Sequence, residues 1–140
     1  MSEILLKEGV PEMKAYMRLY KSTGWKEPGY FGIERTREAL KNCWLVVCAY
    51  SGNELIGSGR IISDGVIHAL ITEMFVLPEW QGKGVGRTVM RHLLKRCKEA
   101  DIRKVQLFSA PGKAEFYHKL GFTGRESHSP GMDWNFDTGL

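Results

Sequence analysis

The hydrophobic positions of this chain recur with a helical period in some segments and form short runs typical of strands in others. The most regular helix follows a glycine-rich stretch, and its apolar residues repeat at every fourth position: Val85, Val89, Leu93 and Cys97. Further helices are predicted to begin at residue 11 and to cover residues 33–42 and 112–120. Strands are predicted over residues 3–8, 44–50, 55–62, 66–77, 104–108 and 132–136.

The order of these elements indicates a mixed sheet flanked by helices, a fold of the α/β (α+β) class. The turn at Asp64-Gly65 is typical of a hairpin, so the strands on either side of it are expected to pair antiparallel. A helix joins the strands over 66–77 and 104–108, and such a crossover implies a parallel pair. Because the chain shows no repeat and no linker, a single domain over residues 1–140 is expected.

The composition is that of an ordinary globular protein, with 43% hydrophobic and 26% charged residues. The net charge of +4 suits an anionic ligand, but no aromatic platform alternates with the basic residues, so no nucleic acid is expected as a partner. No apolar run approaches the roughly 18 residues of a membrane span, and the N-terminus lacks the pattern of a signal peptide. The cysteines, Cys43, Cys48 and Cys97, form no metal-binding spacing. A cytoplasmic protein with reduced thiols, no metal and no membrane partner is therefore expected.

The stretch EWQGKGVGRTVM, residues 79–90, places Gly82, Gly84 and Gly86 between a strand and a helix. It fits neither the GxGxxG dinucleotide fingerprint nor the P-loop, because no glycine and no Lys-Ser or Lys-Thr pair stands at the required spacing. The physical argument still holds, since the first amides of a helix lack internal partners and glycines let an anion approach them. We expect a phosphate or pyrophosphate on the amides of residues 82–88, with an ordinary strand–helix turn as the alternative.

Two segments together resemble the signatures of the GNAT superfamily of N-acetyltransferases, in its small, mostly bacterial branch. Residues 76–90, VLPEWQGKGVGRTVM, resemble the acetyl-CoA motif, and residues 114–122, AEFYHKLGF, resemble the second signature of the family. The resemblance implies a mixed, mostly antiparallel central sheet of about six to seven strands, flanked by about four helices. It also implies a V-shaped split between the fourth and fifth strands.

By the same resemblance, acetyl-CoA is the co-substrate, and its pyrophosphate lies on the glycine loop. The pantetheine arm runs beside the strand before the loop, where a β-bulge opens the sheet and backbone amides near Phe75 polarise the thioester carbonyl. The implied CoA-binding residues are Met74, Phe75, Val76, Gln81, Gly82, Lys83, Gly84, Val85, Gly86, Arg87 and Thr88. Arg91 and Lys95 could also help to bind the phosphates, although a solvated helix face explains them more simply.

Transfer of an acetyl group to an amine by direct attack needs the amine to lose a proton and the leaving thiolate to gain one. Tyr117 matches the family tyrosine that protonates the thiolate, although it could also be a core aromatic. The base is less well defined, because the family positions that often carry one hold no base in this chain. Glu73 acting through water is the first candidate, and its structural alternative is an ion pair with a neighbouring basic residue. His68 and Glu27 are weaker candidates.

The aromatic-rich loop before the second predicted helix is the candidate acceptor site for a small-molecule primary amine. The candidate substrate-binding residues are Trp25, Glu27, Tyr30 and Phe31, with Trp134 from the end of the chain. The aromatic residues among them could equally fill the core. Ala110 stands at about the position where many family members carry an asparagine that contacts CoA, so that contact would pass to the backbone or to Ser109.

Two other functions stay open on the sequence. The acceptor could be a lysine side chain or the N-terminus of a peptide or protein, or the chain could bind CoA as a sensor without turnover. The presence of Tyr117 argues only modestly against a sensor. The oligomeric state is also open, and a homodimer is one option.

Overall fold

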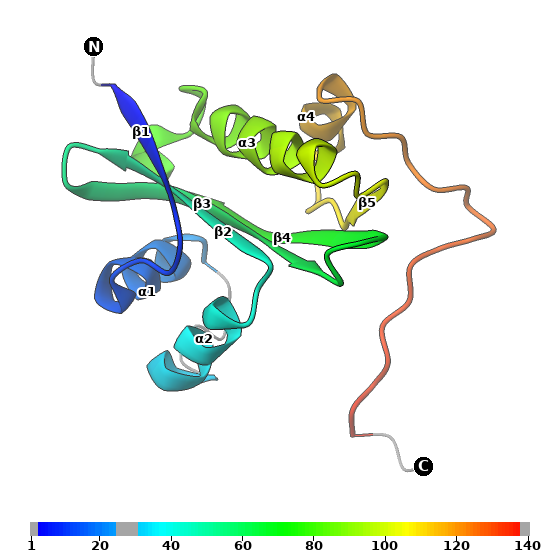
Figure 1. The fold of residues 1–140 in the computed structure, drawn as a ribbon, viewed down its shortest axis with the longest axis horizontal. Helices are drawn as coiled ribbons and strands as arrows, with labels where there is room; N and C mark the ends of the chain where they lie inside the picture. The colour runs from blue at the N-terminus through cyan, green and yellow to red at the C-terminus, as the bar shows by residue number, and fades with distance from the viewer. Residues whose placement is uncertain (1–2, 25–30, 138–140) are drawn as a thin grey trace. The chain divides into compact units, whose positions relative to one another are not determined.

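The computed structural model describes residues 3–24 and 31–137. Within them the chain forms a five-stranded sheet in which sequence neighbours are also neighbours in space (Figure 1). The strands are β1 (Ile4–Glu8), β2 (Leu45–Ser51), β3 (Glu54–Ser63), β4 (His68–Val76) and β5 (Lys104–Leu107). The first three pairings are antiparallel and the last is parallel. The mixed, mostly antiparallel sheet is therefore confirmed, but the described residues form five strands, fewer than expected.

Three helices flank this sheet: α1 (Met13–Ser22), α2 (Gly32–Lys41) and α3 (Val85–Glu99). α3 lies along one face, and α1 and α2 lie on the other side (Figure 1). The four-residue repeat of α3 is buried as predicted, together with Met90. The basic residues of α3 named above lie on its exposed face: Arg87, Arg91 and Lys95. The amphipathic pattern of this helix thus predicted both its length and the face that it turns to the sheet.

Glycines on β3 let α3 lie close to the sheet. A Cβ added to Gly59 would stand only 3.1 Å from Cδ1 of Leu93 in α3 and would clash with Sδ of Met74 in β4. Gly59 therefore faces α3, and because side chains alternate along a strand, Ser58 and Arg60 face α1. This division of faces decides which side chains meet in the site described below.

The β3–β4 hairpin forms around Asp64-Gly65 as predicted, but β4 begins at His68, two residues later than expected. Oδ1 of Asp64 accepts hydrogen bonds from the backbone N–H groups of Val66 and Ile67, each at 2.8 Å. These amides point to the carboxylate instead of joining the ladder, and their bonds lower the pKa of Asp64.

The chain divides into two compact units, Met1–Leu107 and Phe108–Leu140, and the described part of the second contains the short helix α4 (Ala114–Lys119). Residues 132–136 were predicted as a strand, and this prediction is wrong. Their apolar side chains alternate as in a strand, yet Met132 and Phe136 are 86% and 82% exposed. A strand needs a neighbour that completes its ladder, and none of the described strands pairs with this segment.

Candidate active site

β4 carries a β-bulge near its end. Its register with β3 shifts there, so that Glu73 and Met74 together lie opposite Gly59 alone. The backbone of Glu73 is left-handed, with a φ of +53°, which is uncommon for a residue other than glycine. Thr72 pairs with Arg60 and shares its face of the sheet. A regular strand would point the next side chain away, but the bulge brings Glu73 to the same face, that of α1.

β4 and β5 separate after Ile71, which pairs with Leu107 at the end of β5. β4 continues to Val76 without a described strand on that side, and this is the V-shaped split that was expected. The backbone N–H of Leu77, the residue after Val76, donates a hydrogen bond to β3. Because backbone groups alternate in direction along a strand, those of Met74 and Val76 point away from β3. Nε2 of Gln81 donates a hydrogen bond to the Val76 carbonyl at 3.2 Å. The end of β4 thus presents backbone groups to which an extended ligand could pair.

The glycine loop connects the end of β4 to α3. Gly82 and Gly84 have φ values of +77° and +87°, a left-handed conformation that glycine adopts without steric cost. A Cβ at either position would meet no atom within 4 Å among those described, so the space beside the loop is open. Gly84 is the N-cap of α3, and no side chain caps the helix there. Thr88 closes the first turn, since its N–H and its hydroxyl both donate to the Gly84 carbonyl, at 3.0 and 2.8 Å.

The start of α3 is therefore suited to an anion. The first amides of α3 have no partner within the helix and lie at the positive end of its dipole. Val85 is 1% exposed and fixes the helix start against the sheet, while Lys83 and Arg87 are exposed. Nζ of Lys83 lies 5.3 Å from the centre of the Trp80 ring.

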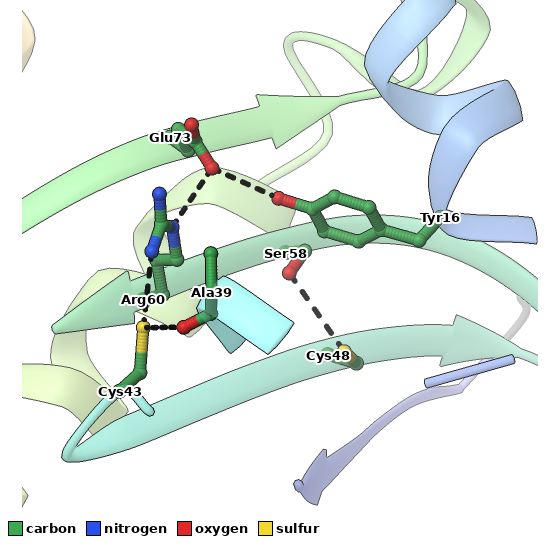
Figure 2. A network of polar contacts seen from close by, with 7 residues as sticks. All are labelled: Tyr16, Ala39, Cys43, Cys48, Ser58, Arg60 and Glu73. Carbon is green, nitrogen blue, oxygen red and sulfur yellow. Dashed lines mark hydrogen bonds and ion pairs between the residues drawn. The ribbon is translucent and has the colours of Figure 1, made fainter. Parts of the chain in front are cut away.

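Glu73 belongs to a network of polar side chains on the α1 side of the sheet (Figure 2). Its Oε2 accepts a hydrogen bond from the hydroxyl of Tyr16 at 3.1 Å and forms an ion pair with Nε of Arg60 at 2.8 Å. Nη1 of Arg60 donates to Sγ of Cys43 at 3.1 Å, and that thiol donates to the Ala39 carbonyl at 3.3 Å. The side chains of Glu73 and Arg60 are only 18% and 14% exposed. Of the interpretations of Glu73, the ion pair is therefore confirmed, and its role as a base stays a prediction.

The network holds its donors in their protonated forms. Burial, followed by the charge of Glu73, raises the pKa of Tyr16 well above the ordinary value of a phenol. Burial by itself would lower the pKa of Arg60, but the hydrogen bonds to Glu73 and Cys43 outweigh it and raise that pKa. Tyr16 is thus a neutral donor and Arg60 a cation at any pH near neutrality.

Tyr117 lies in α4, in the second unit. Its ring packs edge-to-face against those of Phe116 and Phe122, with centroids 5.1 and 6.0 Å apart. Gly121, with a φ of +99°, follows Leu120, the C-cap of α4, and the N–H of Phe122 bonds back to the Tyr117 carbonyl at 3.1 Å. Burial raises the pKa of the Tyr117 phenol, which is therefore protonated at neutral pH.

The other predicted residues are more scattered. His68 is exposed at the start of β4, roughly 26 Å along the strand from Val76 at about 3.3 Å per residue. Phe31 is 48% exposed before α2, with the guanidinium of Arg35 5.9 Å from its ring centre. Trp134 is exposed and contacts the ring of Phe136.

Trp25, Glu27 and Tyr30 lie outside the described residues. The hydroxyl of Ser109 bonds to the carbonyl of Ala110, at 3.0 Å.

Sequence reasoning did not find Tyr16 and Arg60. Tyr16 lies in the helix predicted to begin at residue 11, and it is 1% exposed. The signal for Arg60 was present, since an arginine inside an apolar strand is rarely buried without a partner. That partner could not be named without the bulge, because a regular β4 would turn Glu73 to the other face.

No cluster of three metal-binding side chains occurs in the part of the chain that the structure describes. Among the described helices, none is long and apolar enough to cross a membrane.

A glycine-lined helix start beside a split sheet suits a ligand that carries a phosphate group and an extended arm. Residues 10–122 match the family described as Acetyltransferase (GNAT) family. The chain therefore belongs to the GNAT family of acetyltransferases.

Individual relatives agree with this assignment. The chain is 33% identical over 122 residues to the uncharacterized N-acetyltransferase ycf52 of Porphyra purpurea, covering 84% of this chain and 68% of that protein. It is 33% identical over 113 residues to the histone acetyltransferase TAP1 of Glycine max, covering 73% of this chain but only 49% of that protein. Among solved structures, a GNAT family acetyltransferase from Streptococcus pneumoniae aligns with a TM-score of 0.82 and 25% identity, over 97% of this chain and 100% of the other.

Proposed function

We propose that the protein transfers an acetyl group from acetyl-CoA to the primary amine of a small molecule by direct attack. The observation that carries the proposal is the open, glycine-lined start of α3. It follows the end of β4, where β5 no longer pairs with that strand. Membership of an acetyltransferase family supports the acetyl transfer. The identity of the donor and the class of acceptor are the parts that we add.

The residues present fit acetyl-CoA. The free amides of residues 82–87 would hold its pyrophosphate, because two left-handed glycines leave the approach to them open. Lys83 and Arg87 would add positive charge, whereas Thr88 would only fix the first turn of α3, because its amide and its hydroxyl both already donate to the Gly84 carbonyl. The backbone of Met74 and Val76 would pair with the pantetheine arm. When bound, acetyl-CoA supplies the acetyl thioester.

The remaining CoA-binding residues would support this arrangement. Phe75 packs against Tyr20 of α1 with a centroid distance of 5.0 Å, which fixes β4 at the point of the bulge. Gln81 holds the Val76 carbonyl, and Val85 and Gly86 form the first turn of α3. The amides near Phe75 that point away from β3, those of Met74 and Val76, are the candidates to polarise the thioester carbonyl.

Two side chains would move the protons. Tyr117 holds a proton on its hydroxyl at neutral pH and would give it to the leaving thiolate. For ordinary pKa values of about 10 for the phenol and 8.5 for the thiol, this transfer costs about 2 kcal/mol, and the raised pKa of Tyr117 adds to that cost. Glu73 would take the proton of the amine, directly or through water.

The acceptor class is argued from the chemistry of the aromatic-rich loop and from the relatives. The aromatic residues Trp25, Tyr30 and Phe31, together with Glu27, would suit a cationic amine that carries an aromatic or alkyl group. A serotonin N-acetyltransferase of Oryza sativa is 33% identical to this chain over 93 residues, which favours a small amine. The name of the Glycine max relative, a histone acetyltransferase, favours protein lysine as the second candidate.

Release of CoA thiol from acetyl-CoA tests the proposal. The purified protein is incubated with acetyl-CoA and, in separate reactions, serotonin, spermidine and a lysine-containing peptide. We expect thiol release that depends on serotonin or spermidine. Release with the peptide alone would favour the protein-directed alternative. Binding of acetyl-CoA without amine-dependent release would instead indicate a CoA-binding sensor.

A further inference from the structure

We propose that Tyr16 and Arg60 are positioning residues for acetyl transfer, which bind one carboxylate oxygen of Glu73 and leave the other, Oε1, to accept the proton of the amine. This inference rests on the proposed function. It goes beyond the catalytic residues named so far, because neither Tyr16 nor Arg60 would touch a substrate.

The first observation is that both donors converge on one atom. The Tyr16 hydroxyl and Nε of Arg60 both reach Oε2 of Glu73, at 3.1 and 2.8 Å. Among the described residues, no hydrogen bond or ion pair engages Oε1, and Figure 2 shows that oxygen directed away from both donors. A carboxylate held in this way has one oxygen that is satisfied and one that can still accept a proton.

The second observation is that the donors come from two different elements, each fixed by other contacts. Tyr16 is 1% exposed, and its ring packs against Phe75 with a centroid distance of 6.1 Å. Arg60 is held at its far end by Cys43, at 3.1 Å. Glu73 is therefore clamped between α1 and β3, and neither donor can follow the carboxylate if it turns.

The third observation is the backbone of the bulge itself. Glu73 has a φ of +53°, although this left-handed conformation is sterically unfavourable for a residue with a Cβ. Such a conformation persists where the surrounding contacts determine it, and it is frequent at active sites. The ion pair with Arg60 and the bond from Tyr16 are the contacts that hold the Glu73 side chain on this face. The residues that follow, Met74 and Val76, carry the backbone groups assigned to the pantetheine arm.

A buried ion pair that only stabilises the fold is the competing explanation, and removal of the Tyr16 hydroxyl separates the two. In Tyr16→Phe the ring, its packing and the Arg60 ion pair stay, so the bulge and the binding of acetyl-CoA should be preserved. Oε2 loses one donor, and Glu73 gains freedom to rotate. We expect kcat to fall about 10-fold, because a misplaced group costs rate more than affinity, with the Kd for acetyl-CoA changed less than about 2-fold.

Two further measurements decide between the explanations. In a Glu73→Gln background, in which kcat is already about 10²-fold lower, Tyr16→Phe should cost nothing more, because the hydroxyl acts only through the carboxylate. Tyr50→Phe, which removes a hydroxyl from the same sheet, should leave kcat unchanged.

A fixed mixture of serotonin, spermidine and a lysine-containing peptide serves as the acceptor in all these assays. Full additivity of Tyr16→Phe and Glu73→Gln, or an unchanged kcat in Tyr16→Phe, would overturn the positioning role, while wild-type thiol release with serotonin or spermidine alone would still support the proposed function. If the wild-type protein releases no thiol with this mixture, the proposed function and the positioning role are both overturned.

Discussion

Gly84 and Glu73 both have a positive φ, but for different physical reasons. Gly84 can adopt φ +87° freely, and the open space beside it keeps the first amides of α3 accessible. Glu73 adopts φ +53° at a cost on the order of 1–2 kcal/mol and is held there by Arg60 and Tyr16. One residue therefore leaves room for a ligand, and the other places a functional group.

Replacing Gly84 with alanine should weaken acetyl-CoA binding by more than 10-fold. The new methyl group would project beside the loop amides and would strain the left-handed backbone by about 1–2 kcal/mol. Isothermal titration calorimetry measures the affinity directly. Gly52→Ala is the matched control, because Gly52 in the β2–β3 turn also has a positive φ and an open surrounding.

Gly52→Ala should lose a similar amount of stability in urea denaturation and keep the wild-type affinity. Equal affinities of the Gly84→Ala variant and the wild type would show that no ligand approaches the loop closely.

Replacing Tyr117 with phenylalanine should lower kcat by roughly 10²–10⁴-fold, the range for loss of a general acid. The ring and its packing against Phe116 and Phe122 are retained, so the melting temperature should change little. Steady-state thiol release gives kcat, and calorimetric titration gives the Kd for acetyl-CoA, which should be unchanged. A wild-type kcat would remove Tyr117 from the mechanism.

At the residue scale, the sequence was informative where chemistry and spacing are local. The glycine-rich turn between β4 and α3 could be predicted from the sequence, because turns and helix starts depend on a few adjacent residues. The partners of Glu73 could not, because Tyr16 is 57 positions away. Their meeting depends on a register shift that no periodicity encodes.

At the scale of elements, Gly59 of β3 lies where three of them meet: β3, β4 and α3. It lies opposite the β4 bulge and beneath α3, with no room for a side chain next to Leu93 and Met74. Gly59→Ala should therefore lower the free energy of unfolding by about 1–3 kcal/mol, as expected for overpacking. Urea denaturation measures this change.

The same variant should also lose acetyl-CoA affinity, because the bulge sets the direction of Met74 and Val76. A stable variant with normal affinity would show that the bulge does not need Gly59.

β1 and α3 are joined by a charged cluster. The carboxylate of Glu8 contacts His92 at 2.7 Å and also contacts Arg96. The hydrogen bond from Arg96, then that from His92, lowers the pKa of Glu8. A depressed carboxyl pKa adds stability above its unfolded value of about 4.3, and this stability is lost as the pH falls through the folded value.

Glu8→Gln should therefore cost up to about 1 kcal/mol at pH 7 in low salt, the upper end for a pair this exposed. The difference from the wild type should shrink as the pH falls from 7 to 3, and it should also shrink in 0.5 M salt. Urea denaturation at the two pH values and at the two salt concentrations measures both effects. A difference that is the same at pH 7 and pH 3 would assign the effect to packing instead of charge.

The elements themselves were predicted with uneven success, for a physical reason. α3 was predicted nearly to its ends because its apolar face is long and its period is regular. Residues 132–136 show strand alternation but form no strand, because a strand exists only with a partner and the pattern of one segment does not reveal one.

At the scale of the whole molecule, the proposed functions fall in different units. The residues assigned to CoA binding and Glu73 all belong to the unit Met1–Leu107, whereas Tyr117 belongs to Phe108–Leu140. Cofactor binding and protonation of the thiolate should therefore be separable by mutation. The net charge of +4 would favour association with the anionic cofactor.

Acetyl-CoA should stabilise the folded chain as a whole. A ligand that binds only the folded state at 100 times its Kd adds about 2.7 kcal/mol, which for a domain of this size corresponds to a rise in Tm of roughly 8 °C. Differential scanning fluorimetry with millimolar acetyl-CoA measures the shift. Acetylpantetheine at the same concentration should give a much smaller shift, because it carries no pyrophosphate for the amides at the start of α3.

Tyr117→Phe should show the full shift, because binding does not need the phenol, whereas Gly84→Ala should show about half of it or less, as expected when the affinity falls by more than 10-fold. A Tm that does not move at millimolar acetyl-CoA would refute the assignment of the glycine loop to CoA. Equal shifts with acetyl-CoA and acetylpantetheine would keep the pantetheine contact along β4 and refute the pyrophosphate contact, so the two halves of the proposed site can be tested separately.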